Sequence, residues 1–305
     1  MRLVRERRHQ QGLRLSLPSP LAAADFRQRS HYAALLSAIG PTSPDIESLS
    51  DLEKLTVIGH GNGGTVYKVR NRKSSSVYAL KVLRFDQNAA VIRHQVACEA
   101  EILKRVDSQF VVKCLAHMEK GSLYDELRVR VKLPEDVVSV IAQRVVRGLQ
   151  YLHGMQIVHG DIKPSNLLIN GKGEVKIADF GVSKIVVGTR NACEACMGTC
   201  AYMSPERVDP ERWDGGNADG FSGDVWSLGV VLLECLVGHY PLIGLGEKPD
   251  WAALICAICL GERLEIPETA SPDFRSFVRR CLEKDWRKRG SVDELLGHPF
   301  VNRIL

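Results

Sequence analysis

The chain has 305 residues, of which 45% are hydrophobic and 25% are charged, which suits one large globular domain or two lobes sharing an interface. Its net charge of +5 is modest, and much of the excess lies between Arg2 and Arg14, so it indicates a local basic arm and excludes a broad nucleic-acid-binding face. No apolar run reaches the roughly 18 residues of a membrane span, so neither nucleic acid nor membrane is an expected partner.

Residues 1–50 are rich in Arg, Ser, Pro and Ala without sustained periodicity, which predicts a mobile tail with one short helix near residues 32–39. Runs of β-branched and aromatic residues then predict three antiparallel strands at 52–59, 65–71 and 77–84. A helix at about 89–106 is expected to follow them.

The pattern changes after residue 121. Val138, Ile141, Val145, Leu149 and Leu152 recur at steps of three and four, which predicts an amphipathic helix. Further helices are expected at 224–237, 251–260 and 272–282. The predicted fold class is α+β, with a small, shortened β-rich lobe (about 51–121), a larger helical lobe (about 122–301) and a cleft between them.

The nine cysteines have no secretory leader ahead of them, so we expect a reducing compartment, the cytoplasm and also the nucleus. The pairs Cys193/Cys196 and Cys256/Cys259 have CxxC spacing, but neither has the matching His or Cys partners of a zinc site. We therefore expect no zinc or redox chemistry from them.

A glycine-rich turn lies between the first two predicted strands. Glycines there let backbone N–H groups approach a polyphosphate. No Gly-Lys-Ser/Thr follows, and the chain continues as a strand, so the turn is neither a Walker nor a Rossmann loop. It consists of Gly59, His60, Gly61, Asn62, Gly63 and Gly64.

Charged residues with chemical roles follow at fixed spacings. Lys81 lies within the third predicted strand, where its ammonium needs an anion, and Glu99 and Glu101 on the next helix are rival partners. In the run from Ile157 to Ile169, Asp161 is suited to accept the proton of a substrate hydroxyl. Lys163 is suited to neutralise the charge of a phosphoryl group, and Asn166 is suited to bind magnesium. Asp179, which begins Asp-Phe-Gly after a predicted strand at 175–177, suits the same metal.

In this order, these motifs resemble those of eukaryotic protein kinases over about residues 52–301. The resemblance implies a two-lobed protein kinase fold with ATP and Mg²⁺ as cofactors, and it favours Glu99 over Glu101. It also implies a buried structural ion pair between Glu206 and Arg289. The implied ATP-binding residues are the turn residues 59–64 with Val66, Lys81 and Glu99; Asp161, Lys163 and Lys81 are catalytic, and Asn166 and Asp179 hold the metal.

Other segments resemble a narrower group, the short plant MAP kinase kinases, and in particular an atypical branch with His-Gly-Asp in the catalytic loop. They are the opening MRLVRERR, VKIADFGVSK, the run from Gly198 to Glu206 and PDWAALICAICL. The resemblance implies a monomer that phosphorylates Thr and Tyr of a T-x-Y sequence in a MAP kinase, under an upstream MAP kinase kinase kinase.

The N-terminal arm fits a docking peptide for a MAP kinase. Arg5, Arg7 and Arg8 would meet an acidic patch, and Leu13 and Leu15 an apolar groove. A solvated basic tail and an organelle transit peptide are the alternatives.

Two departures concern regulation. Gly160 stands where most such kinases have an arginine that binds the phosphorylated activation loop. The two phosphorylation positions of that loop correspond to Thr189 and Ala195, so one acceptor is missing too. We hypothesise that activation by an upstream kinase is weakened or replaced.

A third departure is a gap after His117, where relatives are expected to carry another strand and the adenine-binding hinge. Either Leu115–Glu119 serves as an improvised hinge, or the chain is a truncated product that binds ATP poorly. Because Lys81, Asp161, Asn166 and Asp179 are all present, the sequence still favours an active dual-specificity kinase. A catalytically weak MAP kinase-binding protein and a kinase for a different Ser/Thr substrate remain as alternatives.

Overall fold

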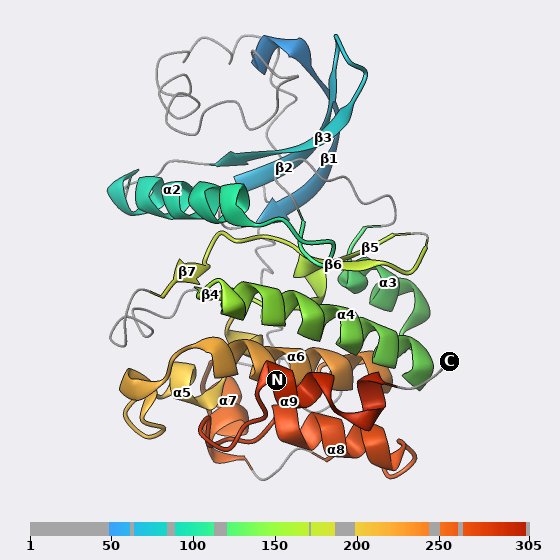
Figure 1. The fold of residues 1–305 in the computed structure, drawn as a ribbon, viewed down its shortest axis with the longest axis vertical. Helices are drawn as coiled ribbons and strands as arrows, with labels where there is room; N and C mark the ends of the chain where they lie inside the picture. The colour runs from blue at the N-terminus through green and yellow to red at the C-terminus, as the bar shows by residue number, and fades with distance from the viewer. Residues whose placement is uncertain are drawn as a thin grey trace, which may run out of the picture. The chain divides into compact units, whose positions relative to one another are not determined.

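The computed structural model describes residues 49–61, 64–83, 89–112, 121–170, 172–186, 199–243, 251–261 and 265–302. Strands dominate the first part of this range and helices the rest (Figure 1). The three N-terminal strands and the α-helices are β1 (Leu52–Gly61), β2 (Gly64–Asn71), β3 (Val77–Leu83), α2 (Ala89–Arg105), α3 (Leu123–Arg130), α4 (Glu135–Gly154), α5 (Pro205–Val208), α6 (Phe221–Val237), α7 (Trp251–Ile255), α8 (Pro272–Cys281) and α9 (Val292–Leu296). The remaining elements are the strands β4 (Ile157–Val158), β5 (Leu167–Ile169), β6 (Val175–Ile177) and β7 (Lys184–Ile185) and the helical turns η2 (Leu49–Asp51), η3 (Pro164–Asn166), η4 (Cys200–Tyr202), η5 (Gly215–Asn217), η6 (Cys256–Leu260) and η7 (Pro299–Val301).

The N-terminal sheet confirms the three predicted antiparallel strands, in the order β1-β2-β3. Its register places Gly59 opposite Val66 and Val66 opposite Lys81. Because directly opposed residues share a face of a sheet, these three residues form one row across it. Val66 therefore lies on the face from which Lys81 extends.

A short connection follows α2. The N–H of Val112 donates to the Ile177 carbonyl at 2.8 Å, and the N–H of Ile169 donates to the Gly121 carbonyl at 2.9 Å. Ile177 and Ile169 belong to β6 and β5, which pair with each other. The chain thus leaves and rejoins the same two-stranded sheet, and among the described residues β3 pairs with β2 alone.

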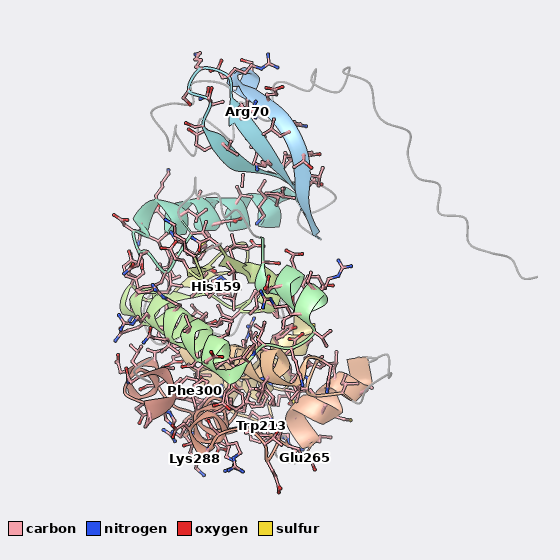
Figure 2. The ribbon with its side chains drawn as sticks, turned by 90° about the vertical axis from the view of Figure 1, so that its right-hand side faces the viewer. Arg70, His159, Trp213, Glu265, Lys288 and Phe300 are labelled. Atoms are coloured by element: carbon pink, nitrogen blue, oxygen red, sulfur yellow. The ribbon has the colours of Figure 1, made fainter. Side chains whose placement is uncertain are left out.

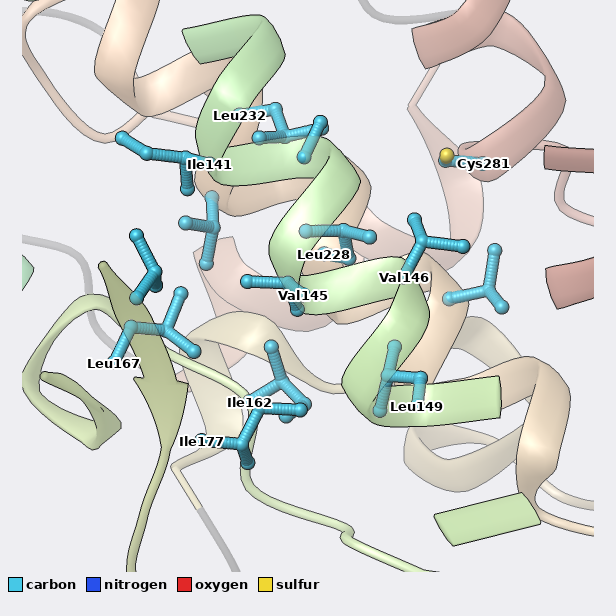
Figure 3. Close-up of a cluster of buried hydrophobic side chains, with 14 of the residues drawn as sticks. Ile141, Val145, Val146, Leu149, Ile162, Leu167, Ile177, Leu228, Leu232 and Cys281 are labelled. Carbon is cyan, nitrogen blue, oxygen red and sulfur yellow. The ribbon is translucent and has the colours of Figure 1, made fainter. Parts of the chain in front are cut away.

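The helical part is built around α4 and α6. The predicted stripe on α4 is confirmed, because Val138, Ile141, Val145, Leu149 and Leu152 are all buried. Ile141, Val145 and Leu149 extend toward Leu228 and Leu232 of α6 on one side and toward the β5–β6 sheet on the other (Figure 3). This core supports the loops that carry the polar residues described below.

Helix α6 is buried along most of its length, as its continuous apolar sequence predicts. It begins at Phe221, one turn before the predicted Asp224, because the Asp219 carboxylate accepts from the Phe221 N–H at 2.9 Å. Gly229 lies against α8, where an added Cβ would be 2.7 Å from the Cβ of Cys281. Only glycine permits this approach.

Other predicted elements differ in detail. The helix expected at 251–260 is α-helical to Ile255 and then continues as a π-helix, in which the Gly261 N–H reaches the Cys256 carbonyl five residues back. Helices α3, α5 and α9 were not individually predicted. The segments expected to form a helix at 32–39 and an improvised hinge at 115–119 lie outside the described residues.

Within the described ranges, no helix combines the length and apolar character needed to cross a membrane. The described cysteines, Cys256 and Cys259 included, are free thiols, whereas Cys193 and Cys196 lie outside the described residues.

Candidate active site

Lys81 joins β3, α2 and the segment after β6. Its Nζ lies 3.0 Å from Glu99 Oε1 and 2.7 Å from Asp179 Oδ1. The rival acid, Glu101, points elsewhere and pairs with Arg105 on its own helix at 2.8 Å. The structure therefore brings together Lys81, Glu99 and Asp179, three of the residues singled out in the sequence.

The pKa values of this cluster follow from burial and charge. Burial alone would lower the pKa of Lys81, but the two carboxylates outweigh it and the pKa is raised. Burial would raise the pKa of Asp179, but Lys81 outweighs it and holds that pKa below its usual value. For Glu99, burial prevails over Lys81 and the pKa is raised. Asp179 is thus the carboxylate kept ionised most firmly.

Asp161 lies in the loop between β4 and η3, with its carboxylate surrounded by donors. Lys163 Nζ lies 2.6 Å from Oδ2, Asn166 Nδ2 lies 3.0 Å from Oδ2, and the Thr199 N–H donates to Oδ1 at 2.9 Å. Lys163 also contacts Thr199 Oγ1 at 2.5 Å. Three residues predicted from one motif therefore meet a fourth from the segment that begins at residue 199.

Asp224, at the N-terminal end of α6, binds the backbone of this loop. Its carboxylate accepts the N–H groups of His159 at 2.9 Å and Gly160 at 2.8 Å, and it lies 3.0 Å from His153 Nε2. His159 lies in the interior (Figure 2), where Phe180 packs edge-on against its ring at a centroid distance of 5.1 Å. Buried hydrogen bonds of this kind fix the path of the backbone that leads to Asp161.

His159 is held neutral in this position. Burial lowers its pKa, although the carboxylate of Asp224 opposes the shift. Its Nε2 lies 3.1 Å from the Ala178 carbonyl, which only accepts, and its Nδ1 accepts the Asp161 N–H at 3.3 Å. The neutral tautomer with hydrogen on Nε2 satisfies both contacts.

The Asp179-Phe180-Gly181 segment is fixed beside Asn166. The Ala178 N–H donates to the Asn166 backbone carbonyl at 2.9 Å, Phe180 is 1% exposed, and Asp179 has a φ of +67°. Left-handed backbone at a non-glycine residue is strained and is often found at functional sites. Here it accompanies the turn of the Asp179 carboxylate toward Lys81.

The residues present fit a magnesium site. Asp179 offers carboxylate oxygens, and Asn166 uses Nδ2 to bond Asp161, which leaves its amide oxygen for a cation. No group of three or more His, Cys, Asp or Glu among the described residues could enclose a metal. This donor set suits Mg²⁺, which is commonly bound by one or two carboxylates together with substrate phosphates.

Several candidate residues lie partly or wholly outside the described range. β1 ends at Gly61 and β2 begins at Gly64, so the strand-turn-strand arrangement is present, while Asn62 and Gly63 between them are not described. Thr189, Ala195 and the arm residues Arg5, Arg7, Arg8, Leu13 and Leu15 also lie outside the described residues.

Comparison with known proteins identifies the family. A model of the protein kinase domain matches residues 52–301. Mitogen-activated protein kinase kinase 10 of Arabidopsis thaliana is 54% identical over 314 residues, 99% of each chain. From the same plant, mitogen-activated protein kinase kinases 9 and 7 are 48% and 44% identical over 319 residues, with 100% of each chain covered.

The chain belongs to the MAP kinase kinases. The predicted family, protein kinase fold and kinase function are thereby confirmed, and a protein kinase domain uses ATP as its phosphate donor. The alignments over 319 residues are longer than the 305 residues of this MAP kinase kinase. Those relatives therefore carry residues for which it has no counterpart.

Sequence reasoning missed several supporting residues of this MAP kinase kinase. Thr199 was part of a run that resembles the family, and position 224 was only the start of an expected helix. Thr199 bonds Asp161 from 38 residues away, and Asp224 bonds the loop at Gly160 from 64 residues away. Arg207, which donates to the Gly160 carbonyl, was not singled out. The Glu206–Arg289 pair expected from the resemblance is present and buried, with Nη1–Oε1 at 2.7 Å and Nη2–Oε2 at 2.9 Å.

Proposed function

We propose that this MAP kinase kinase transfers the γ-phosphoryl group of ATP to the Thr and Tyr of a T-x-Y sequence in a MAP kinase. The observation that carries the proposal is the Asp161 carboxylate, held by Lys163, Asn166 and the Thr199 N–H. A carboxylate fixed by three donors beside the Lys81–Asp179 pair is suited to orienting a hydroxyl for attack on a phosphoryl group.

The roles of the side chains follow from their charges. Asp161 accepts the proton of the substrate hydroxyl as the oxygen–phosphorus bond forms and the bond to ADP breaks. Lys163, 2.6 Å from Asp161, neutralises charge that develops on the phosphoryl oxygens. Lys81 holds the other phosphates and is itself positioned by Glu99. Mg²⁺, held by Asp179 and Asn166, would neutralise phosphate charge when bound.

The row of Gly59, Val66 and Lys81 supports a nucleotide site beneath the N-terminal sheet. Val66 offers an apolar surface on the face from which Lys81 extends, and Gly59 adds no side chain to that face. The base end of this site depends on residues 113–120, which connect Val112 to Gly121. Fully extended, they span roughly 28 Å, whereas a strand running out and back along β3 would need roughly 46 Å.

This short connection supports the second candidate function, a MAP kinase-binding protein with weak activity. Docking in either case is assigned to Arg5, Arg7 and Arg8, with Leu13 and Leu15 entering an apolar groove. An upstream MAP kinase kinase kinase is the proposed activator, although Gly160 and Ala195 suggest that its effect through Thr189 is weak. Residues 51–301 are proposed as the kinase domain of a monomer.

Two measurements on the full chain test the proposal. Magnesium-ATP binding is measured by calorimetry beside Asp179→Ala, and phosphate transfer is measured with a MAP kinase whose T-x-Y is intact or changed to A-x-F. We expect micromolar ATP binding that Asp179→Ala loses, and transfer that needs T-x-Y and is lost in Asp161→Asn.

The outcomes separate the candidates. No ATP binding at millimolar concentration, together with retained MAP kinase binding through the arm, would favour the binding protein. Transfer to other Ser/Thr peptides but not to T-x-Y would favour a different substrate. Replacing Arg5, Arg7 and Arg8 by Ala tests the docking assignment, because MAP kinase affinity should fall while ATP affinity is unchanged.

A further inference from the structure

Gly160, the residue before Asp161, has both of its backbone groups held by side chains. Its N–H donates to Asp224 Oδ1 at 2.8 Å, and its carbonyl accepts from Arg207 Nη1 at 2.7 Å. Its φ of +78° lies in the left-handed region that glycine adopts without strain. Because glycine is also the most flexible residue, the conformation here depends strongly on these two bonds.

The bond from Arg207 acts on the peptide group that leads into Asp161. The carbonyl of that peptide bonds Arg207, and its N–H, which belongs to Asp161, donates to His159 Nδ1 at 3.3 Å. A planar peptide held at both ends cannot rotate without breaking a bond. Its orientation sets the position of the Asp161 carboxylate relative to Lys163 and Thr199.

Arg207 reaches this peptide from helix α5. Its Cδ passes close to Gly223 of α6, where an added Cβ would lie 3.4 Å away, so the stem runs alongside the start of α6. Its Nη1 would lie 4.0 Å from a Cβ built on Gly160. The guanidinium thus lies beside the position from which an arginine at residue 160 would extend.

We propose that Arg207 is a positioning residue for phosphoryl transfer, holding the Gly160–Asp161 peptide in the transfer-competent orientation without a charged side chain at position 160. The catalytic loop is then fixed by α5 and α6, which do not depend on a phosphate at Thr189. This inference rests on the proposed kinase activity.

The first test compares three full-length variants in the MAP kinase assay. Arg207→Met keeps the stem but removes the donor; the loss of a charge-assisted hydrogen bond should lower kcat about tenfold, with the KM for ATP unchanged. Arg207→Lys retains a donor and should recover part of the loss. Arg212→Met, an exposed arginine just after α5, is the matched control and should behave as wild type.

The second test is independent of activity. Amide hydrogen exchange is measured on the peptides that cover residues 157–163, in wild type and Arg207→Met. Exchange should be faster there in the variant and unchanged in α4 and α8. Unchanged exchange at 157–163 would overturn the positioning role of Arg207, whether or not the wild-type protein transfers phosphate. A wild-type protein that transfers no phosphate would contradict the proposed kinase function instead.

The first test has its own refuting results. A kcat for Arg207→Met within about twofold of wild type would overturn the positioning role. So would an equal fall in Arg207→Met and Arg207→Lys with a lower melting temperature in both, because this pattern would indicate a general structural role for the arginine.

Discussion

Arg289 provides a quantitative test of the packing of the helical part. Its side chain and that of Glu206 are 0% and 2% exposed, and they form two parallel bonds of 2.7 and 2.9 Å. Arg289 also donates to the carbonyls of Glu283 and Ser222 at 2.8 Å each, and lies over the Trp226 ring at 5.2 Å. Replacing Arg289 by Met would leave a buried carboxylate and several carbonyl groups without their donor.

Breaking a buried pair in this way typically costs about 3–5 kcal/mol of unfolding free energy. At about 2 °C per kcal/mol for a domain of this size, the melting temperature should fall by about 6–10 °C. Thermal unfolding followed by tryptophan fluorescence measures this shift. Arg287→Met is the control, because Arg287 pairs with Asp285 and Asp214 at the surface and its loss should leave the melting temperature unchanged.

A double variant separates the charge from the packing. With Glu206→Met added to Arg289→Met, no buried charge remains, and much of the lost stability should return. If Arg289→Met melts at the same temperature as Arg287→Met, the reasoning from burial is refuted. If the double variant is less stable than Arg289→Met alone, the two side chains stabilise the fold mainly by filling space in the interior and not by the pairing of their charges.

Three other expectations follow from the site. Glu99→Gln should lower kcat/KM at least tenfold, because Lys81 loses the anionic partner on α2 that positions it and keeps only Asp179, whereas Glu101→Gln should stay near wild type in the same assay. Tyr202→Phe removes the 2.7 Å bond to Glu234, whose pKa is raised by burial, and should cost about 1–3 kcal/mol in urea unfolding; no loss would mean that water replaces the hydroxyl. Burial holds the pKa of His159 below 6.5 in the folded protein, so as the pH falls His159 binds a proton in the unfolded chain before it does in the folded one. The folded state should therefore lose stability as the pH is lowered past about 6.5. A melting temperature that stays constant from pH 7.5 to 5.5 would contradict this.

The strands and the longest helices could be predicted because their signals are local. The stripe on α4 repeats over several turns, and the runs in β1, β2 and β3 are rich in β-branched residues. Helices α3 and α9 were missed although each begins with a capping box, Ser122 with Asp125 and Ser291 with Glu294. Reading these spacings as N-terminal caps would have located both helices.

The catalytic residues could be predicted for a similar reason, since Asp161, Lys163 and Asn166 lie within one loop. Their supports could not, because Thr199 and Arg207 reach that loop from 38 and 47 residues away. No spacing indicates that an arginine on α5 will bond a backbone carbonyl in another loop. Such contacts depend on how α5 and α6 pack, which is a property of the folded core.

The short connection after α2 and the complete catalytic loop belong to separate parts of the molecule. Val112 and Gly121, which precede and follow the connection, both bond the β5–β6 sheet, and among the described residues the bonds around Asp161 come from Lys163, Asn166 and Thr199. The residues assigned to the phosphate end of the nucleotide are therefore positioned by contacts that come from other parts of the chain. In the nucleotide site that we propose, the shortened connection would instead affect the base end, where the resemblance implies a backbone hinge that bonds adenine. Recognition in this MAP kinase kinase should accordingly rest on the phosphates more than on the base, so ATP affinity and catalytic geometry can vary independently of each other.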